Sequence, residues 1–210
     1  MSDIKVGRIV LSICATNCYY IYREGSTECI VIDPADRGDQ IYEVLRSKGL
    51  NVGNILLTHG HFDHIWGCDE LRKLSGAGVY ALDKEEMLLG DPSLNASAEV
   101  GRPCTVKADV LVSDLEVMEL GDFRIQVLAT PGHTSGSCCY LLLDEDILFS
   151  GDTLFEESVG RTDLPTGNGG ELARSIREKL DPLDDKVKVY PGHGDMTTIG
   201  HEREYNYFWN

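Results

Sequence analysis

The chain has 210 residues, 42% of them hydrophobic, which is enough to bury a sizeable core, and we predict one domain over residues 1–210. The formal net charge of −16 disfavours general attraction to nucleic acid backbones and to anionic membrane surfaces, so we expect neither as a partner. A nuclease would need a local basic groove that works against this total charge.

Targeting signals and cysteine spacing bear on the compartment. No apolar run approaches the length of a membrane span, and the first residues lack a basic region followed by an apolar stretch. The seven cysteines are odd in number and contain no Cys-x-x-Cys pair, which fits a reducing compartment. We therefore predict a cytoplasmic protein, in which the adjacent Cys138 and Cys139 are small residues of the core.

The first half of the chain predicts alternating strands and helices. In chain order these are strands 19–23 and 29–33, helix 39–48, helix 69–74 and strand 79–82. Gly49 follows the first helix where a C-terminal cap belongs. Asp83 with Glu86 three residues later is an acidic variant of a capping box and predicts a helix that reaches residue 89.

The second half begins with irregular structure at residues 90–105, which are rich in Gly, Pro, Ser and Asn. A meander of strands is predicted between residues 110 and 149. An amphipathic helix follows at 171–180, with apolar residues on one face at Leu172, Ile176 and Leu180. The sequence Asp181-Pro182 ends this helix.

Four potential metal ligands occur within six residues: His59, His61, Asp63 and His64. Three of the six histidines of the chain are therefore in one turn. Neutral imidazole and carboxylate groups are the ligands that zinc and similar divalent ions accept. The alternative is a solvated polar loop, but imidazoles this close need a shared cation or the loss of their protons. The run predicts a metal site.

Further candidate ligands stand at the ends of strand-like apolar runs. Two such runs, 125–130 and 187–190, lead into Pro-Gly-His and end at His133 and His193. The runs 54–58 and 147–151 lead in the same way to His59 and Asp152. The sequence thus places the functional residues on loops that a rigid sheet holds.

The His-x-His-x-Asp-His run at 59–64, followed in order by His133, Asp152 and His193, resembles the motif set of the metallo-β-lactamase-fold hydrolases. The resemblance extends over nearly the whole chain. Periodicity alone indicates a mixed α/β protein, and the resemblance implies a four-layer α/β/β/α sandwich. It also implies a dinuclear centre, with one metal bound by His59, His61 and His133, the other by Asp63, His64 and His193, and Asp152 bridging them. No cysteine stands at a ligand position, which differs from one class of true β-lactamases and disfavours antibiotic hydrolysis.

Within that superfamily, the stretch 160–165 and the sequence 191–194 are most similar to short-form glyoxalase II-type proteins. In the long form, the corresponding loop carries a Lys and a Tyr that contact glutathione, whereas this chain has Arg161 and Asp163 there. We predict that Arg161 and Asp163 contact substrate, with a structural turn as the alternative. Only 17 residues (194–210) follow His193, so we expect no helical C-terminal domain, and we expect the aromatic tail to dock on the surface.

The chemistry expected of two adjacent cations is hydrolysis by a bridging hydroxide, with Asp63 and Asp152 as metal ligands that orient it. A thioester such as S-D-lactoylglutathione suits this site, because a thiol of pKa about 8.5 departs without a strong general acid. Lactones and other esters are further substrates to consider. Two divalent ions per chain are expected, Zn²⁺ first, with Fe or Mn as alternatives.

Two other classes of function remain open at this point. Persulfide dioxygenases share this fold and a Gly-Arg-Thr-Asp loop, but use one iron bound by two histidines and an aspartate, which would here be His59, His133 and Asp152. Metal count and oxygen uptake distinguish that oxidoreductase from a hydrolase. A non-catalytic metal-binding protein is the third class, and turnover of any ester or thioester would exclude it. The oligomeric state is not predicted.

Overall fold

The computed structural model describes residues 2–209. The first half of these residues forms a six-stranded sheet in the order β1-β2-β3-β4-β5-β6. Its strands are β1 (Ile4–Leu11), β2 (Thr16–Arg23), β3 (Glu28–Ile32), β4 (Asn51–Leu56), β5 (Gly78–Leu82) and β6 (Val110–Val112). The pairs β1-β2 and β2-β3 are antiparallel, and β3 to β6 are parallel.

The second half forms another six-stranded sheet, in the order β14-β13-β10-β9-β8-β7. Its strands are β7 (Val117–Leu120), β8 (Phe123–Ala129), β9 (Cys138–Leu142), β10 (Ile147–Gly151), β13 (Lys188–Pro191) and β14 (Thr197–Thr198). All neighbours are antiparallel except β10 and β13, which are parallel. A small hairpin of β11 (Leu154–Phe155) and β12 (Ser158–Val159) follows β10.

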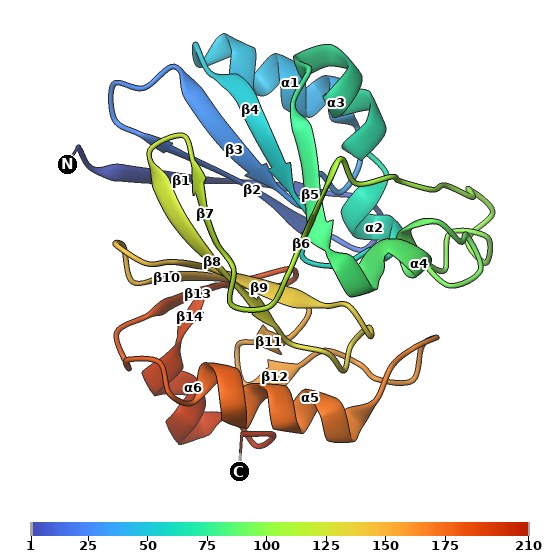
Figure 1. Ribbon diagram of the computed structural model, residues 1–210, viewed down its shortest axis with the longest axis vertical. Helices are drawn as coiled ribbons and strands as arrows, with labels where there is room; N and C mark the ends of the chain where they lie inside the picture. The colour runs from blue at the N-terminus through green and yellow to red at the C-terminus, as the bar shows by residue number, and fades with distance from the viewer. Residues whose placement is uncertain (1, 210) are drawn as a thin grey trace.

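Helices cover the outer faces of both sheets. They are α1 (Gly38–Ser47), α2 (Phe62–Ile65), α3 (Cys68–Ser75), α4 (Glu86–Leu89), α5 (Gly169–Ser175) and α6 (Ile199–Tyr205), with a 3₁₀ turn at Asp83–Glu85 and a π-helical turn at Ile176–Leu180. Helices α1 and α3 lie outside the first sheet, at the top of Figure 1, and α5 and α6 lie outside the second, at the bottom. Over residues 2–209, no helix combines the length and the hydropathy needed to cross a bilayer.

Alternation along the strands explains the layers, because successive side chains point to opposite faces of a sheet. In β3, Cys29 and Val31 pack in a cluster with the helices α1 and α3, whereas Ile30 and Ile32 pack in the cluster between the two sheets. In β9, Tyr140 joins the same central cluster from the second sheet. A third cluster lies between the second sheet and α5 and α6. These three cores separate four layers and confirm the predicted α/β/β/α sandwich.

Most predicted elements are confirmed. The five elements predicted in the first half coincide with β2, β3, α1, α3 and β5, and residues 90–105 are irregular. Cys138 and Cys139 are both buried, as predicted. The strands β1, β11, β12 and β14 have no counterpart among the predicted elements. Each of the last three has only two residues, which is too short for a periodic signal.

Two predictions are wrong. The helix predicted after Asp83 does reach Leu89, but Asp83 does not cap it, because Asp83 lies inside a 3₁₀ turn and its Oδ1 accepts a hydrogen bond from the adjacent Lys84 N–H. The strand meander does not begin at residue 110, because β6 pairs with β5 in the first sheet. The apolar run of β6 suits either sheet, so its residues alone could not assign it.

The helix predicted at residues 171–180 starts earlier than its apolar periodicity indicates, and a capping side chain defines its first residue. It begins at Gly169, and the side chain of Asn168 caps it by accepting hydrogen bonds from the backbone N–H groups of Gly170 (3.0 Å) and Glu171 (3.1 Å). These groups have no partner within the helix, so an Asn at this position satisfies them.

We predict that Asn168→Ala lowers the free energy of unfolding by about 1 kcal/mol, because two N–H groups lose their acceptor. Urea unfolding of both proteins measures the difference. Asn168→Asp is the control, since aspartate accepts the same hydrogen bonds. Equal losses in the Ala and Asp variants would contradict the capping role.

Candidate metal centre

In each sheet, the predicted ligands come directly after the C-terminal ends of strands. His59 and His61 follow β4, whereas His133, Asp152 and His193 follow β8, β10 and β13 in the second sheet. Strands β8, β10 and β13 share one direction, because β8 and β10 are both antiparallel to β9 and β10 is parallel to β13. Their C-terminal ends therefore lie side by side. Asp63 and His64 stand on the short helix α2 that follows the β4 loop.

The first group of ligands is formed by the buried residues His59, His61 and His133, one ligand nitrogen of each lying within 4.8 Å of the others. His61 Nδ1 is 2.8 Å from His133 Nε2, and the ring centroids of His59 and His133 are 4.8 Å apart. The first two residues come from the first sheet and the third from the second. Three converging imidazoles are a donor set typical of zinc and similar ions.

The second group, Asp63, His64 and His193, meets the same 4.8 Å limit. His193 Nε2 lies 3.3 Å from both His64 Nε2 and Asp63 Oδ2. The His64 side chain is completely buried, whereas 27% of the His193 side chain is exposed. This group of ligands is therefore open to a cleft at His193.

Asp152 lies between the two groups. Its Oδ2 is 3.5 Å from His133 Nε2 of the first group and 3.4 Å from His193 Nε2 of the second, and its Oδ1 is 3.4 Å from His64 Nε2. The residue before His193 must be glycine, since a Cβ on Gly192 would lie 2.2 Å from Asp152 Oδ1. Both groups and the carboxylate between them thus form one cluster.

The hydrogen bonding of the cluster shows that its donors fit a cation. Within residues 2–209, the buried side-chain nitrogen and oxygen atoms without a hydrogen-bond partner are His59 Nε2, His61 Nε2 and Asp152 Oδ1. All three belong to this cluster. Since buried polar atoms without partners are costly, an ion that takes up their lone pairs relieves that cost.

Burial keeps His59 and His61 of the first group neutral. It lowers the pKa of His61 to about 3 and the pKa of His59 well below its ordinary value, with neighbouring histidines lowering both further. Both imidazoles therefore carry a free lone pair at neutral pH, which is the form that binds a metal.

Neighbouring carboxylates control the protonation of the histidines in the second group. Burial opposes the charge on His64, but Asp152, Asp63 and a third carboxylate outweigh it and hold the pKa of His64 well above its ordinary value. Hydrogen bonds with Asp152 and Asp63 likewise overcome burial and raise the pKa of His193 to about 9. In return, and against burial, the pKa of Asp63 falls to about 2. Positive charge is thus favoured at this group, and a cation there would take the place of protons.

Asp33, at the end of β3, is the third carboxylate beside His64 and was not among the predicted site residues. Its Oδ2 accepts hydrogen bonds from His64 Nδ1 (2.9 Å) and from Thr58 Oγ1 (2.6 Å), and its Oδ1 accepts one from Thr58 N–H (2.8 Å). The hydrogen bond to Nδ1 holds the His64 imidazole so that its Nε2 faces the other ligands. A signal was present, because Asp33 is the first polar residue after a buried strand, as Asp152 is.

Glu85 is a second residue that the sequence did not single out. It is 1% exposed, and its carboxylate accepts hydrogen bonds from Gly60 N–H (2.7 Å) and from Thr134 Oγ1 (2.9 and 3.1 Å). Gly60 lies between two ligands of the first group and Thr134 follows the third. Glu85 therefore ties together the two loops that carry the first group. Within the charged run 83–86, nothing local distinguishes it from its neighbours.

A cleft of about 420 Å³ opens over the cluster. Ligands from both groups line it, together with apolar side chains and the thiol of Cys14. The carbonyl of Cys14 also accepts a hydrogen bond from His193 Nδ1 (3.2 Å), which orients that ligand. The loop between β1 and β2 therefore forms part of the site, a role that the sequence did not predict.

Arg161 and Asp163 lie at the rim of this cleft. The Arg161 guanidinium pairs with both carboxylate oxygens of Asp163, at 2.7 and 2.8 Å, and both side chains are largely exposed. Arg161 lines the cleft and its carbonyl accepts a hydrogen bond from His133 Nδ1 (2.8 Å). The carbonyl group of Arg161 thus orients His133, while the Arg161 side chain stays accessible. Asp163, the ion-pair partner of Arg161, does not itself line the cleft.

The C-terminal segment docks as predicted. Trp209 is 6% exposed and packs in the core between the second sheet and its helices. His201, on α6, interacts with Glu157 at 3.2 Å and is not part of the metal cluster. The sixth histidine is therefore separate from the site, as expected.

A family model described as the Metallo-beta-lactamase superfamily matches residues 11–193, most of the chain. The chain belongs to this superfamily. Its similarity extends to "Probable metallo-hydrolase YqgX" of Bacillus subtilis (strain 168), which is 40% identical over 196 residues, with 92% of each chain covered.

Two further relatives carry more specific names. "Hydroxyacylglutathione hydrolase GloC" of Haemophilus influenzae is 32% identical over 200 residues, with 92% of each chain covered. A crystal structure of "BLEG-1 B3 metallo-beta-lactamase" is 39% identical, has a TM-score of 0.93, and is matched over 98% of this chain and 99% of that one. With the donor cluster, these likenesses support a metal-dependent hydrolase.

We predict that Asp33→Asn lowers the metal affinity of the second group about 10- to 100-fold, because the amide has a single acceptor oxygen and cannot accept all three hydrogen bonds that the carboxylate accepts from His64 and Thr58. Elemental analysis after dialysis against a weak chelator measures the loss. Asp39→Asn, at an exposed aspartate on α1, is the control and should retain metal. Full retention by Asp33→Asn in a folded protein would contradict the role of Asp33.

Glu85 gives a pH-dependent prediction. Burial raises its pKa from 4.5 to about 7, so the folded protein binds this proton more tightly than the unfolded chain does. The stability gained from the protonated form is full below pH 4.5 and is lost as the pH rises through 7. The free energy of unfolding of Glu85→Gln, relative to wild type, should therefore increase from pH 4.5 to 8, by at most about 3 kcal/mol. Urea unfolding of the metal-free proteins measures this, and a difference that is constant with pH would refute it.

Proposed function

We propose that this protein is a dinuclear metal-dependent thioesterase of the glyoxalase II type, with S-D-lactoylglutathione as the first substrate to test. The observation that carries the proposal is the pair of three-ligand groups with Asp152 between them, at the base of an open cleft. The likeness to a hydroxyacylglutathione hydrolase supports the choice of substrate.

Each residue of the cluster has a role in this proposal. His59, His61 and His133 would hold one cation and Asp63, His64 and His193 the other, with Asp152, which lies between the two groups, available to both. When bound, such a pair of cations lowers the pKa of a water between them and stabilises negative charge on a carbonyl oxygen. Asp63 and Asp152 keep their negative charge at neutral pH and can accept hydrogen bonds from a nucleophilic water.

The side chains of the cleft favour thioesters over substrates with poorer leaving groups. Apart from the ligands, the titratable residues that line it are Cys14 and Arg161. Arginine keeps its proton, and burial raises the pKa of the Cys14 thiol, so neither is a strong general acid. A thiol of pKa about 8.5 can depart as its anion without such help.

The cation is proposed to be Zn²⁺, since histidine and carboxylate donors suit it, with iron and manganese as the alternatives. A small-molecule thioester is the proposed partner, and the cytoplasm the proposed compartment. The second group of three ligands supports a dinuclear site over the mononuclear iron site of a persulfide dioxygenase, which would use His59, His133 and Asp152 alone.

β-Lactam hydrolysis is a second candidate. It is favoured by the likeness to BLEG-1, which covers nearly all of both chains. The same cluster and cleft would serve it, but the nitrogen that leaves is a poorer leaving group than a thiolate and gains more from a proton donor.

The deciding experiment measures turnover of S-D-lactoylglutathione and of a chromogenic cephalosporin by protein whose zinc, iron and manganese contents are known. We expect thioester turnover with about two metals per chain, and loss of both metal and turnover in His59→Ala. Turnover of the cephalosporin alone would favour the second candidate. One iron per chain with oxygen uptake on a persulfide would overturn both hydrolase proposals.

We predict that Arg161→Ala raises the Michaelis constant for S-D-lactoylglutathione about tenfold and retains both metals, because the guanidinium is proposed to bind a substrate carboxylate. Steady-state kinetics with elemental analysis measures this. Asp163→Asn is the paired variant and should lower the Michaelis constant, since it releases Arg161 from its ion pair. Unchanged constants in both variants would exclude substrate contact by this pair.

A further inference from the structure

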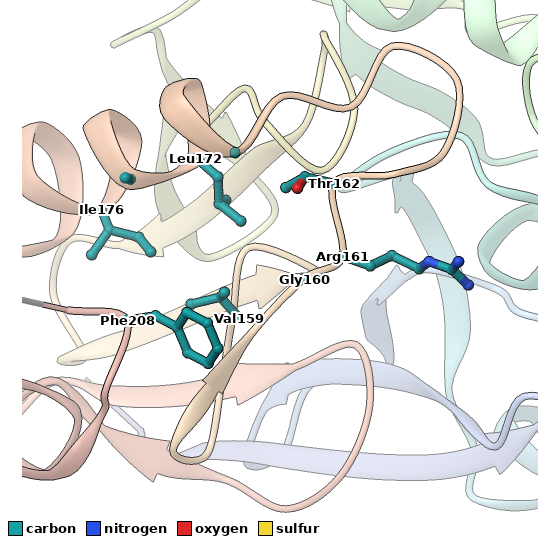
Figure 2. Close-up of a pocket in the computed structure, with 9 residues that line it drawn as sticks. Val159, Gly160, Arg161, Thr162, Leu172, Ile176 and Phe208 are labelled. Carbon is teal, nitrogen blue, oxygen red and sulfur yellow. The ribbon is translucent and has the colours of Figure 1, made fainter.

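A second pocket, of about 380 Å³, lies beside the metal cleft. Figure 2 shows Leu172 and Ile176 pointing into it from one side and Val159 and Phe208 from the other, while the Arg161 side chain extends away from it. Ala173 completes the apolar lining. Elements distant in sequence thus build this pocket, namely the strand β12, the helix α5 with its π-helical turn, and the C-terminal segment.

The pocket adjoins the metal cleft across the segment 159–162. Val159 and Arg161 line both of them. Gly160, which lines the pocket, packs against the metal cluster, since a Cβ on it would lie 1.8 Å from the Asp152 carbonyl oxygen and 3.2 Å from His133 Nδ1. One thickness of backbone therefore separates the apolar pocket from two of the proposed ligands.

The chemistry of the pocket selects what can occupy it. Leu172 and Ile176 are almost completely buried, whereas 51% of Phe208 is exposed, so the pocket is apolar at its base and open to solvent at Phe208. Its polar lining comes from Arg161 and Thr162. The Arg161 charge is paired with Asp163 and directed away from the pocket, so a carboxylate would lose hydration there without gaining a charged partner.

We propose that this pocket is a specificity site that binds an apolar aliphatic or aromatic substituent of the substrate while its carbonyl group lies at the metal cluster. The inference rests on the proposed thioesterase function and deepens it: among thioesters, those with an apolar substituent of several carbons should be preferred to S-D-lactoylglutathione, whose acyl and thiol parts are both polar. That substituent belongs either to the acyl group or to the thiol group, and burial of apolar area stabilises both in the same way.

The test compares substrates that differ only in apolar length. In the first series, acetyl, butanoyl and hexanoyl thioesters share one small thiol, and in the second, acetyl thioesters carry an ethyl, butyl or hexyl thiol. For the metal-loaded wild type we expect kcat/KM to rise by up to about fourfold per methylene in one of the two series. The series that responds identifies which side of the substrate occupies the pocket.

Variants test whether the length dependence of kcat/KM arises in this pocket. Ala173→Phe fills the pocket from an exposed position of α5, and Phe208→Ala removes its outer apolar surface. Each should reduce the hexyl-to-ethyl or hexanoyl-to-acetyl ratio to less than about twofold. Arg177→Phe is the matched control, since it introduces the same side chain at an exposed position of the π-helical turn that does not line the pocket, and should keep the wild-type ratio. Thermal unfolding and metal analysis confirm that each variant is folded and loaded.

The proposal is overturned if neither series shows a length dependence in wild type, or if Ala173→Phe and Phe208→Ala both keep the wild-type ratio. It is also overturned if Arg177→Phe reduces the ratio as Ala173→Phe does. If no thioester is hydrolysed, the proposed function fails, and calorimetry with acetate against hexanoate and ethanethiol against hexanethiol decides the pocket separately. Tighter binding of a longer ligand that Ala173→Phe removes supports the pocket, and equal binding refutes it.

Discussion

The structure depends on an unusual concentration of charge and lone pairs in a buried volume. Six proposed ligand residues and the Asp152 carboxylate between them converge within a few ångströms, and three of their buried polar atoms have no hydrogen-bond partner. Without a cation, the carboxylates favour protonated His64 and His193, while burial keeps His59 and His61 neutral. Such an arrangement opposes folding unless the scaffold is stable and an ion compensates the donors, so the metal centre and the fold are energetically coupled.

The sandwich meets this demand because each sheet contributes ligands from the ends of buried strands. His61 and His133 approach to 2.8 Å although 72 residues separate them, which is possible only because the two sheets face each other at this edge. Buried carboxylates then hold the loops in place. Asp33 connects the end of β3 to Thr58 and His64, and Glu85 connects the two loops of the first group.

The sequence predicts those residues of the site that carry a local signal, and it misses those that act through contacts distant in the sequence. The run from His59 to His64 is local, so its ligands could be recognised directly, and the strand-to-turn pattern identified His133, Asp152 and His193. Asp33 obeys the same pattern but lacks a second cue, and Glu85 acts through contacts that are 25 or more residues away in the sequence. The layer order of the sandwich came from the family resemblance, since alternation shows which strands are buried but not which strands are neighbours.

The pocket beside the cleft was beyond sequence reasoning for the same physical reason. Val159, Leu172 and Phe208 come from three separate segments, each of which is explained locally as core or tail. The metal cluster provides a chemistry that can act on many carbonyl compounds, because its contacts reach only the reacting atoms. Selection among such substrates must therefore come from groups that contact the rest of the molecule. In this chain those groups lie on either side of the segment 159–162, with the Arg161 charge facing the cleft and the apolar side chains facing the pocket. A substrate that uses both sides of this segment would combine a charged or polar part at the rim with an apolar part below it, so that the two contacts together position the carbonyl carbon over the metal cluster.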